Sequence, residues 1–258
     1  AGKKVVVVEQ LEDPKQAKKI VKRGVTRIIT PGTVLEDNIL SPTRNNYLTS
    51  IALEGKRFGI AICDVSTSEV FMTQSDDRNL LFGELEKFQP AELVVRRSFA
   101  SQDIIETCHR LNITISRVDD ELFDFETALH ITGKQFDKKK INELSKHNEL
   151  TTSALGPLIS YVKRNLLKDT TSLSFPELYS LSQSMVLDQT TQRNLELVSN
   201  QIDGSRKGTL FATLNHTMTG MGARHLQKIL LSPSLDIETI KKRQDAIGFL
   251  VDDPILLG

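Results

Sequence analysis

The chain has 258 residues, of which 33 are basic and 33 are acidic, so its formal net charge is zero. Its hydrophobic fraction of 39% and charged fraction of 26% are those of an ordinary globular protein, long enough for about two domains. The charge balance excludes proteins that hold nucleic acid through an overall positive charge. Any contact with nucleic acid has to come from a local basic patch.

The two cysteines, Cys63 and Cys108, have neither a paired spacing nor the pattern of a metal site. We interpret them as buried free thiols in a reducing cytoplasm, with a disulfide as the less favoured alternative. No apolar run approaches about 20 residues, and no signal peptide is visible. The sequence therefore predicts a cytoplasmic chain.

The first zone, residues 1–36, begins with a short apolar strand over residues 4–8. A capped helix is expected next, ended by Gly24, and then a strand over residues 25–30 that stops at Pro31-Gly32. The helix carries a basic face: Lys15, Lys18, Lys19, Lys22 and Arg23. This face is either a solvated surface that suits the helix dipole or a surface near nucleic-acid phosphate.

The second zone, residues 37–170, alternates strand and helix patterns. Strands are expected at residues 47–53, 58–64, 70–73, 93–95 and 113–118, and helices at 78–88, 101–110 and around 155–162. Strands joined by helices indicate an α/β fold whose mixed sheet has a parallel part. The third zone, residues 171–258, has an almost wholly helical pattern, with helices at 209–214, 222–231 and 237–251, the last capped by Asp236.

Known catalytic motifs do not occur in this sequence. There is no phosphate-binding loop, no His-Glu-x-x-His, no cysteine cluster and no Gly-x-Ser-x-Gly. One constellation deserves a test: Asp64 ends a strand, Glu84 lies on a helix and Asp119 follows a later strand. Carboxylates that cluster in this way bind magnesium and cleave phosphodiesters in nucleases with a ribonuclease-H-like fold. The alternative is that Asp64 makes a turn with Ser66 or Thr67 and that Glu84 is an ordinary helix residue.

Ordered motifs along the whole chain resemble those of the MutS family of DNA mismatch-recognition ATPases. They are "VTRIITPGT", "NNYL", "GIAICDVSTSE", "QPAELV", "LDQTTQRNLEL" and "GTLFATLNHTMTGMGARHLQKILLSPSLDIETIKKRQDAI". The resemblance implies three parts: the αβ tail of the mismatch-binding domain (1–36), a ribonuclease-H-like α/β connector domain (37–170), and the start of the all-α core or lever domain (171–258). In the third part, Gly222 and Arg224 match family positions at a core-domain junction, whereas Gly220 and Ile229 replace a frequent proline and a usual tryptophan.

The resemblance also sets expectations about function. It implies a non-catalytic middle region that transmits conformational change and contributes to docking of MutL, with no cofactor of its own. The parent protein would use ATP and magnesium, bind mismatched duplex DNA and form a MutS homodimer. A possible MutL surface is the aromatic-rich stretch with Leu122, Phe123, Phe125 and Phe136, unless these side chains pack inward. The alternative function is a magnesium-dependent nuclease that uses Asp64, Glu84 and Asp119. The family's Phe-x-Glu wedge is matched only by Phe82-Gly83-Glu84, which we interpret as a chance match.

Overall fold

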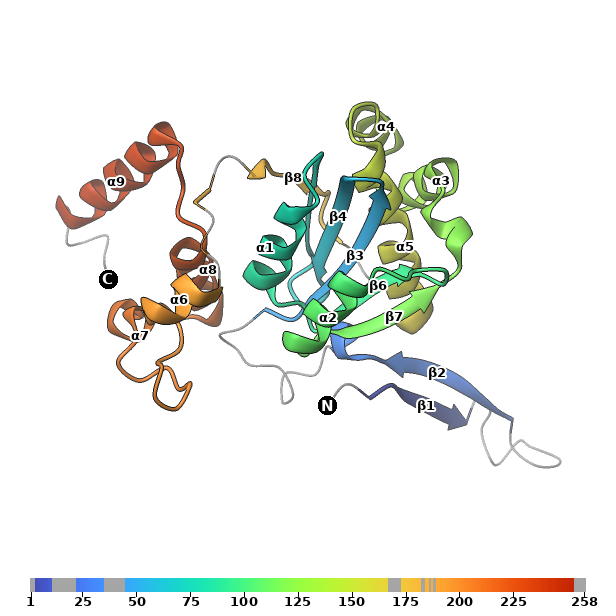
Figure 1. The fold of residues 1–258 in the computed structure, drawn as a ribbon, viewed down its shortest axis with the longest axis horizontal. Coiled ribbons are helices and arrows are strands. Elements are labelled where there is room, and N and C mark those ends of the chain that lie inside the picture. The colour runs from blue at the N-terminus through green and yellow to red at the C-terminus, as the bar shows by residue number, and fades with distance from the viewer. Residues whose placement is uncertain are drawn as a thin grey trace. The chain divides into compact units, whose positions relative to one another are not determined.

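The computed structural model describes residues 3–10, 22–34, 45–166, 173–181, 184–185, 187 and 189–252. The contacts divide the chain into two compact units, residues 1–179 and residues 180–258 (Figure 1). Each unit is described here by itself. Unit 1 contains the first and second zones of the sequence together with the beginning of the third.

A two-stranded antiparallel sheet opens unit 1. Its strands are β1 (Val5–Gln10) and β2 (Arg23–Ile29), followed by the 3-10 helix η1 (Pro31–Thr33). The expected helix up to Gly24 is wrong at its end, because Arg23 and Gly24 pair with Gln10 and Glu9 in this sheet. Of the basic face, Lys15, Lys18 and Lys19 lie outside the described residues.

A six-stranded mixed sheet forms the centre of unit 1, in the order β7-β6-β3-β4-β5-β8. Its strands are β3 (Tyr47–Glu54), β4 (Arg57–Asp64), β5 (Glu69–Ser75), β6 (Glu92–Arg96), β7 (Thr114–Val118) and β8 (Glu177–Leu178). β3, β4 and β5 are antiparallel, whereas β6 and β7 continue parallel to β3. The predicted mixed α/β architecture is thereby confirmed.

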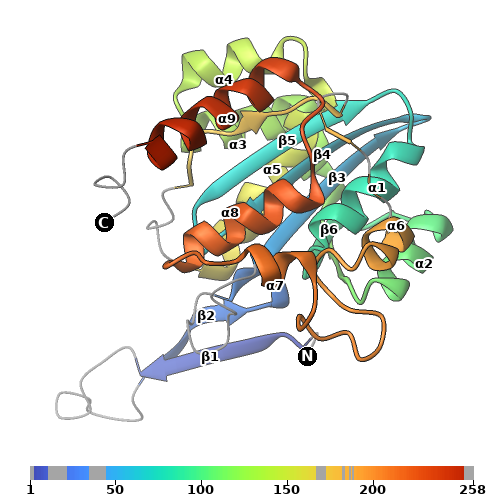
Figure 2. The ribbon, with the colours of Figure 1, turned by 90° about the vertical axis from the view of Figure 1, so that its left-hand side faces the viewer.

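Helices cover both faces of this sheet (Figures 1 and 2). α1 (Asn79–Phe88) and α2 (Gln102–Arg110) lie on one face, and α5 (Glu149–Leu166) lies on the other. The 3-10 helix η2 (Asp120–Phe123) and the helices α3 (Phe125–Gln135) and α4 (Lys138–Ser145) pack around α5. α5 is thus buried between the sheet and a second helical layer, which explains why it is apolar or small over most of its surface.

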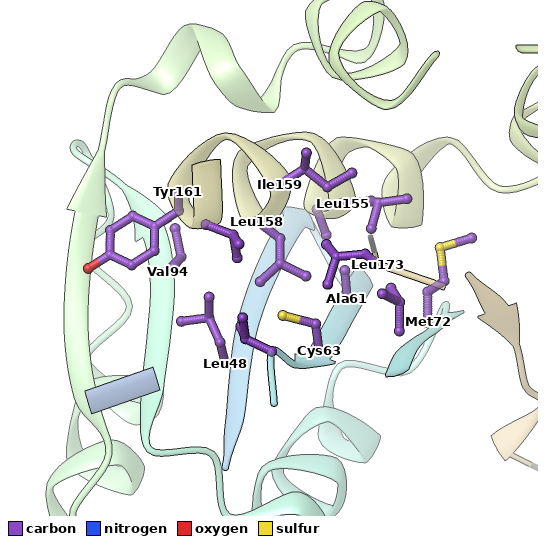
Figure 3. Close-up of a cluster of buried hydrophobic side chains, with 14 of the residues drawn as sticks. Leu48, Ala61, Cys63, Met72, Val94, Leu155, Leu158, Ile159, Tyr161 and Leu173 are labelled. Atoms are coloured by element: carbon purple, nitrogen blue, oxygen red, sulfur yellow. The ribbon is translucent and has the colours of Figure 1, made fainter. Parts of the chain in front are cut away.

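Alternate strand residues build the core between the sheet and α5 (Figure 3). The sheet contributes Leu48, Ala61, Cys63, Met72 and Val94, and α5 contributes Leu155, Leu158, Ile159 and Tyr161. Two glycines allow α5 to pack closely against its neighbours, Gly59 where it meets β4 and Gly156 where it meets α3. A Cβ on Gly59 would lie 2.2 Å from the backbone carbon of Leu150, and one on Gly156 would lie 2.5 Å from the Cα of Ala128.

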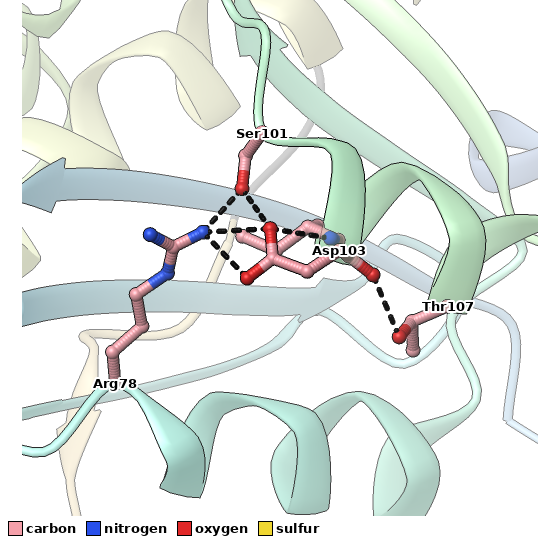
Figure 4. Close-up of polar contacts among 5 residues, drawn as sticks. Arg78, Ser101, Asp103 and Thr107 are labelled. Atoms are coloured by element: carbon pink, nitrogen blue, oxygen red, sulfur yellow. Dashed lines mark hydrogen bonds and ion pairs between the residues drawn. The ribbon is translucent and has the colours of Figure 1, made fainter.

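A polar network ties the beginnings of α1 and α2 together (Figure 4). The Arg78 guanidinium contacts both carboxylate oxygens of Asp103, at 2.9 and 3.0 Å, and also bonds the Ser101 hydroxyl. Ser101 precedes α2 as expected, but its hydroxyl donates to Asp103 and does not cap the helix. This bond, together with the neighbouring contacts, holds the pKa of Asp103 below its usual value.

Unit 1 ends in an extended segment, residues 173–179, which we call the strap. It contains β8, which pairs in parallel with β5 through Phe71↔Glu177 and Met72↔Leu178. The helical pattern expected around Leu178 is therefore wrong. The strap contacts the connector sheet, although the sequence places it in the third zone.

The helices of unit 2 are α6 (Gln189–Asn194), α7 (Leu210–Leu214), α8 (Gly220–Leu231) and α9 (Ile237–Asp252). The predicted cap of α9 is confirmed: the Asp236 carboxylate accepts from the Thr239 backbone N–H at 3.0 Å. The mostly helical character of this segment is confirmed as well. Across the described part of the chain, no helix is both long and apolar enough to cross a membrane.

Candidate functional site

The three carboxylates of the nuclease hypothesis do not come together. Asp64 ends β4 at the edge of the sheet where β6 and β7 begin, because Tyr47 pairs with Asp64 and Leu48 with Glu92. Asp119 follows the other end of β7, where it is exposed and forms an ion pair of 2.7 Å with Arg97. Among the described residues no cluster of acidic, histidine or cysteine side chains could hold a metal ion. The structure therefore corrects the nuclease hypothesis: Asp64 and Asp119 lie at opposite ends of the strands and do not form one site.

Asp64 is fully buried and serves as a hydrogen-bond acceptor for two turns. One oxygen accepts from the backbone N–H of Ser66 at 2.9 Å and from its hydroxyl at 2.6 Å, which is the turn that the alternative reading predicted. The other oxygen accepts from the Asn45 side chain at 2.8 Å and from the Asn46 backbone at 3.1 Å. Asn46 in turn donates from its amide to the Pro31 carbonyl at 2.9 Å. Asp64 thus supports the η1 turn through Asn46.

Glu92, at the start of β6, is the second fully buried carboxylate at this edge of the sheet. Its Oε2 accepts from the Thr30 hydroxyl at 2.5 Å and from the Gly32 backbone N–H at 3.0 Å. Its Oε1 accepts from the Tyr161 hydroxyl at 2.5 Å and from the Ser116 hydroxyl. One carboxylate therefore joins the η1 turn to β6, β7 and α5.

The η1 turn is shaped to fit against Glu92. The hydroxyl of Thr33 accepts from the Thr30 backbone N–H at 3.1 Å and bonds the Thr30 hydroxyl, so the turn is closed internally. Thr30 and Thr33 are 1% and 0% exposed. A Cβ on Gly32 would lie 2.7 Å from Leu48 and 3.0 Å from the Cβ of Glu92, so a side chain at position 32 would push the turn away.

We call this arrangement the amino-terminal junction: residues 30–33, Asn46, Asp64, Glu92, Ser116 and Tyr161. A buried carboxylate is costly unless hydrogen bonds replace its hydration, and here hydroxyl and N–H donors surround both carboxylates. Hydrogen bonds to an ionised acceptor are about twice as strong as neutral ones. Both carboxylates are buried from solvent and all their oxygens accept hydrogen bonds. Such groups can hold two segments of the chain together, but they have no free oxygen for catalysis.

Glu84, the third predicted carboxylate, binds the strap. It accepts from the Tyr179 hydroxyl, and the Lys87 ammonium lies 3.5 Å from its other oxygen. The reading of Glu84 as an ordinary solvated helix residue is wrong, since the residue is 7% exposed.

The predicted MutL surface lies only partly at the surface. Phe123 is 1% exposed, and the Arg96 guanidinium lies 5.3 Å from the centre of its ring. The expectation that Phe123 lies at an interface is therefore wrong. Leu122 and Phe136 are half-buried against the core, and Phe125 is half-buried at the start of α3. Elsewhere, Gly222 and Arg224 both lie on α8, where the Gly222 backbone N–H donates to the Thr219 hydroxyl at 3.1 Å.

Apart from Asp64, the residues that build the junction escaped prediction from sequence. Glu92 stands in the motif "QPAELV", directly before an apolar run, and a charged residue at the start of a buried strand was the available signal. Nothing local connects it to Thr30 or Tyr161, which are 62 and 69 positions away in the chain.

Comparison with known proteins gives the family. The profile of MutS domain II matches residues 46–174, that of MutS domain III matches residues 190–257, and that of MutS domain I matches residues 1–38. The chain is 34% identical to the DNA mismatch repair protein MutS of Methanococcoides burtonii over 99% of its own length and 29% of that protein's. It is 37% identical to the proteins of that name from Methanothrix thermoacetophila and Thermosynechococcus vestitus, over 97% of this chain and 27% and 30% of theirs. The chain, which spans less than a third of the length of these relatives, belongs to the MutS family of DNA mismatch repair proteins.

Proposed function

We propose that this chain is the non-catalytic middle region of a mismatch-recognition ATPase. In this proposal it transmits conformational change between the DNA-binding part and the ATPase part of its parent protein, and its connector contributes to docking of MutL. Binding of mismatched duplex DNA, ATP turnover with magnesium, and homodimer formation belong to the parent protein.

The amino-terminal junction is the observation that carries this proposal. The η1 turn, at the end of the segment that matches domain I, is held against the connector sheet, because Glu92 accepts hydrogen bonds from Thr30 and Gly32. The same carboxylate is bonded by Tyr161 of the central helix α5. A displacement of the η1 turn therefore has to break buried, charge-assisted bonds or move the connector with it.

Transmission is tested in the full-length parent protein with Glu92→Ala, which removes the shared acceptor. Mismatch binding should persist, because the change lies outside the DNA-binding part, whereas the stimulation of ATP turnover by mismatched duplex should fall several-fold. The matched control is Glu69→Gln, a strand glutamate of the same sheet that is bonded locally to Thr67. Unchanged stimulation in a Glu92→Ala protein that still folds would refute transmission through this junction.

MutL docking is proposed for the connector because that part of the chain forms a complete sheet covered by helices on both faces. A complete unit offers a preformed surface and avoids the cost of ordering on binding. Of the half-buried Leu122, Phe125 and Phe136, the last lies just before α4, whose exposed Lys138, Lys139 and Lys140 would form a polar rim.

The docking test is a MutL pull-down with the 258-residue chain. Lys139→Glu combined with Lys140→Glu reverses charge on the proposed surface without touching the core, and it should weaken capture. Lys18→Glu combined with Lys22→Glu, on the basic stretch of the first zone, is the matched pair and should leave capture unchanged. If the Lys18→Glu and Lys22→Glu pair weakened capture and the Lys139→Glu and Lys140→Glu pair did not, the docking surface would not lie on the connector.

A further inference from the structure

The first half of the strap is held against the rest of unit 1 by side chains: the Phe175 ring lies 5.8 Å from that of Phe136, edge to face, and Pro176 is buried. The backbone N–H of Ser174 donates to the Ser68 carbonyl at 2.8 Å, and that of Tyr179 donates to the Met72 carbonyl at 3.0 Å. β8 between them has only two residues, and both of its side chains, Glu177 and Leu178, are exposed. Leu173 anchors the first end in the core, where it is 8% exposed.

The other end of the strap is held by a compact cluster around Tyr179. The Tyr179 hydroxyl donates to the Glu84 carboxylate of α1, and the Tyr179 ring lies 6.2 Å from that of Phe88. The Lys87 ammonium lies 5.0 Å from the centres of both rings and 3.5 Å from Glu84. The nearly buried Glu84 carboxylate is thus stabilised by the Tyr179 hydroxyl on one oxygen and by the Lys87 ammonium on the other.

We propose that the strap is a releasable element of the connector and that the Tyr179–Glu84 hydrogen bond is the latch that keeps it docked. A two-residue edge strand with exposed side chains contributes little stability by itself, so such a segment opens as a local unit unless its end is fixed. Leu173, Phe175 and Pro176 hold the first half of the strap, whereas the side-chain contacts described for its carboxyl end are those of Tyr179. The β3–β4–β5 ladder beneath is continuous and does not need the strap to remain paired.

Release of the strap would change the connection between the two units. Tyr179 is the last residue of unit 1 and Leu173 stays anchored in the core, so an undocked strap adds residues 174–179 to the tether that leads into unit 2. Six extended residues reach about 20 to 22 Å. If the proposed function holds, the latch regulates how strictly the connector and the following domain III segment move together.

The test is hydrogen exchange of the 258-residue chain, which needs neither DNA nor MutL, so its result is independent of whether the proposed function is correct. Tyr179→Phe keeps the ring and deletes the hydroxyl. The peptide covering residues 173–181 should exchange about tenfold faster, as expected for a lost hydrogen bond to a charged acceptor, while β3 and β4 should keep their protection.

Two further variants make the test specific. Tyr161→Phe also deletes a tyrosine–glutamate bond in this sheet, but at Glu92, and should leave the strap peptide unchanged. Glu84→Gln keeps an acceptor for Tyr179 and should remain closer to the wild type than Glu84→Ala does. Unchanged exchange of the strap in Tyr179→Phe would overturn the proposal. An equal rise across the whole connector would also overturn it, since the strap would then not open by itself.

Discussion

The Thr30 hydroxyl donates a 2.5 Å hydrogen bond to the Glu92 carboxylate, and this bond joins the end of the domain I segment to the connector sheet. Glu92 accepts from Tyr161 of α5 with its other oxygen. The two hydroxyls share one carboxylate acceptor. The loss of one hydroxyl leaves more of the negative charge of Glu92 to be stabilised by the hydroxyl that remains. Thr30 and Tyr161 should therefore be energetically coupled without touching each other.

The first prediction is a measurable coupling between these donors. Thr30→Val and Tyr161→Phe each delete one hydroxyl, and each should lower the free energy of unfolding by roughly 1.5 to 3 kcal/mol. The double variant should deviate from additivity by about 0.5 kcal/mol or more. Urea unfolding followed by circular dichroism measures this, and the same cycle in a Glu92→Ala background should show additivity. Additivity in both backgrounds would contradict the shared-carboxylate account.

The second prediction separates Glu92→Gln from Glu92→Ala. A glutamine can accept from Thr30 and Gly32 with its oxygen and donate to the Ser116 and Tyr161 hydroxyls with its amide. It should therefore cost about 1 to 2 kcal/mol, because charged bonds become neutral ones. Alanine leaves four buried donors without their acceptor and should cost clearly more. Equal losses in urea unfolding would show that the acceptor geometry is not what stabilises the site.

The third prediction concerns Asp64. Asp64→Asn should reduce stability, because each oxygen of the fully buried carboxylate accepts two hydrogen bonds and the asparagine nitrogen that replaces one oxygen can accept neither of its two. The expected loss is roughly 1 to 3 kcal/mol. With magnesium and duplex DNA, neither the wild-type chain nor the variant should cleave, since Asp119 lies at the opposite edge of the sheet. Cleavage that disappears in Asp64→Asn would restore the nuclease hypothesis.

The fourth prediction compares Gly59 of β4 with Gly55 of the turn that precedes this strand. Gly59→Ala places a Cβ 2.2 Å from the backbone of Leu150, so α5 has to shift, and we expect a loss of about 3 kcal/mol or more. Gly55, in the β3–β4 turn, has φ +58° and open space around it. Gly55→Ala should therefore cost only about 1 kcal/mol, from backbone strain alone. Thermal unfolding of both variants checks the order.

The fifth prediction concerns ionisation of Tyr179. Burial, and then the neighbouring Glu84 carboxylate, raise its pKa well above the usual value of about 10. The groups that face it are Glu84, Lys87 and Tyr47. Because the raised pKa favours the neutral form in the folded state, the stabilisation is complete below about pH 10 and is lost as the pH rises above it. An ultraviolet titration should show a tyrosine that ionises late, and Tyr179→Phe should remove that late step.

Unit 2 should be less protected against hydrogen exchange than the connector. No residue of α9 is buried, and its Ile237, Ile247, Phe249 and Val251 are 60% to 67% exposed. Each fully buried aliphatic side chain is worth about 1.5 to 3 kcal/mol, so such exposure is large compared with the net stability of a domain. Uniform protection of residues 47–64 and 237–252 in a dilute monomer would contradict this expectation.

Local patterns in the sequence were sufficient for most of the connector. β-branched and apolar runs separated by Gly55-Lys56 and Ser66-Thr67 predict β3, β4 and β5, since side-chain alternation and turn chemistry act over a few residues. Pro90, which follows the C-cap residue Gln89, likewise marks where α1 stops. The cap of α9 at Asp236 could be predicted for the same reason, because its hydrogen bond joins residues only three positions apart. The mixed sheet follows, because strands joined by helices have few arrangements.

The tertiary structure decided what the polar residues do. Whether Asp64, Glu84 and Asp119 meet depends on which ends of β4 and β7 share an edge of the sheet, and strand pairing fixes this only after the chain has folded. The partners of Glu92 are set in the same way, by elements that no local pattern links. β8 has two residues and no periodicity, so its pairing depends on the edge that β5 offers. The sequence by itself determined most elements of the connector and the family, whereas long-range packing decided which buried carboxylates hold those elements together.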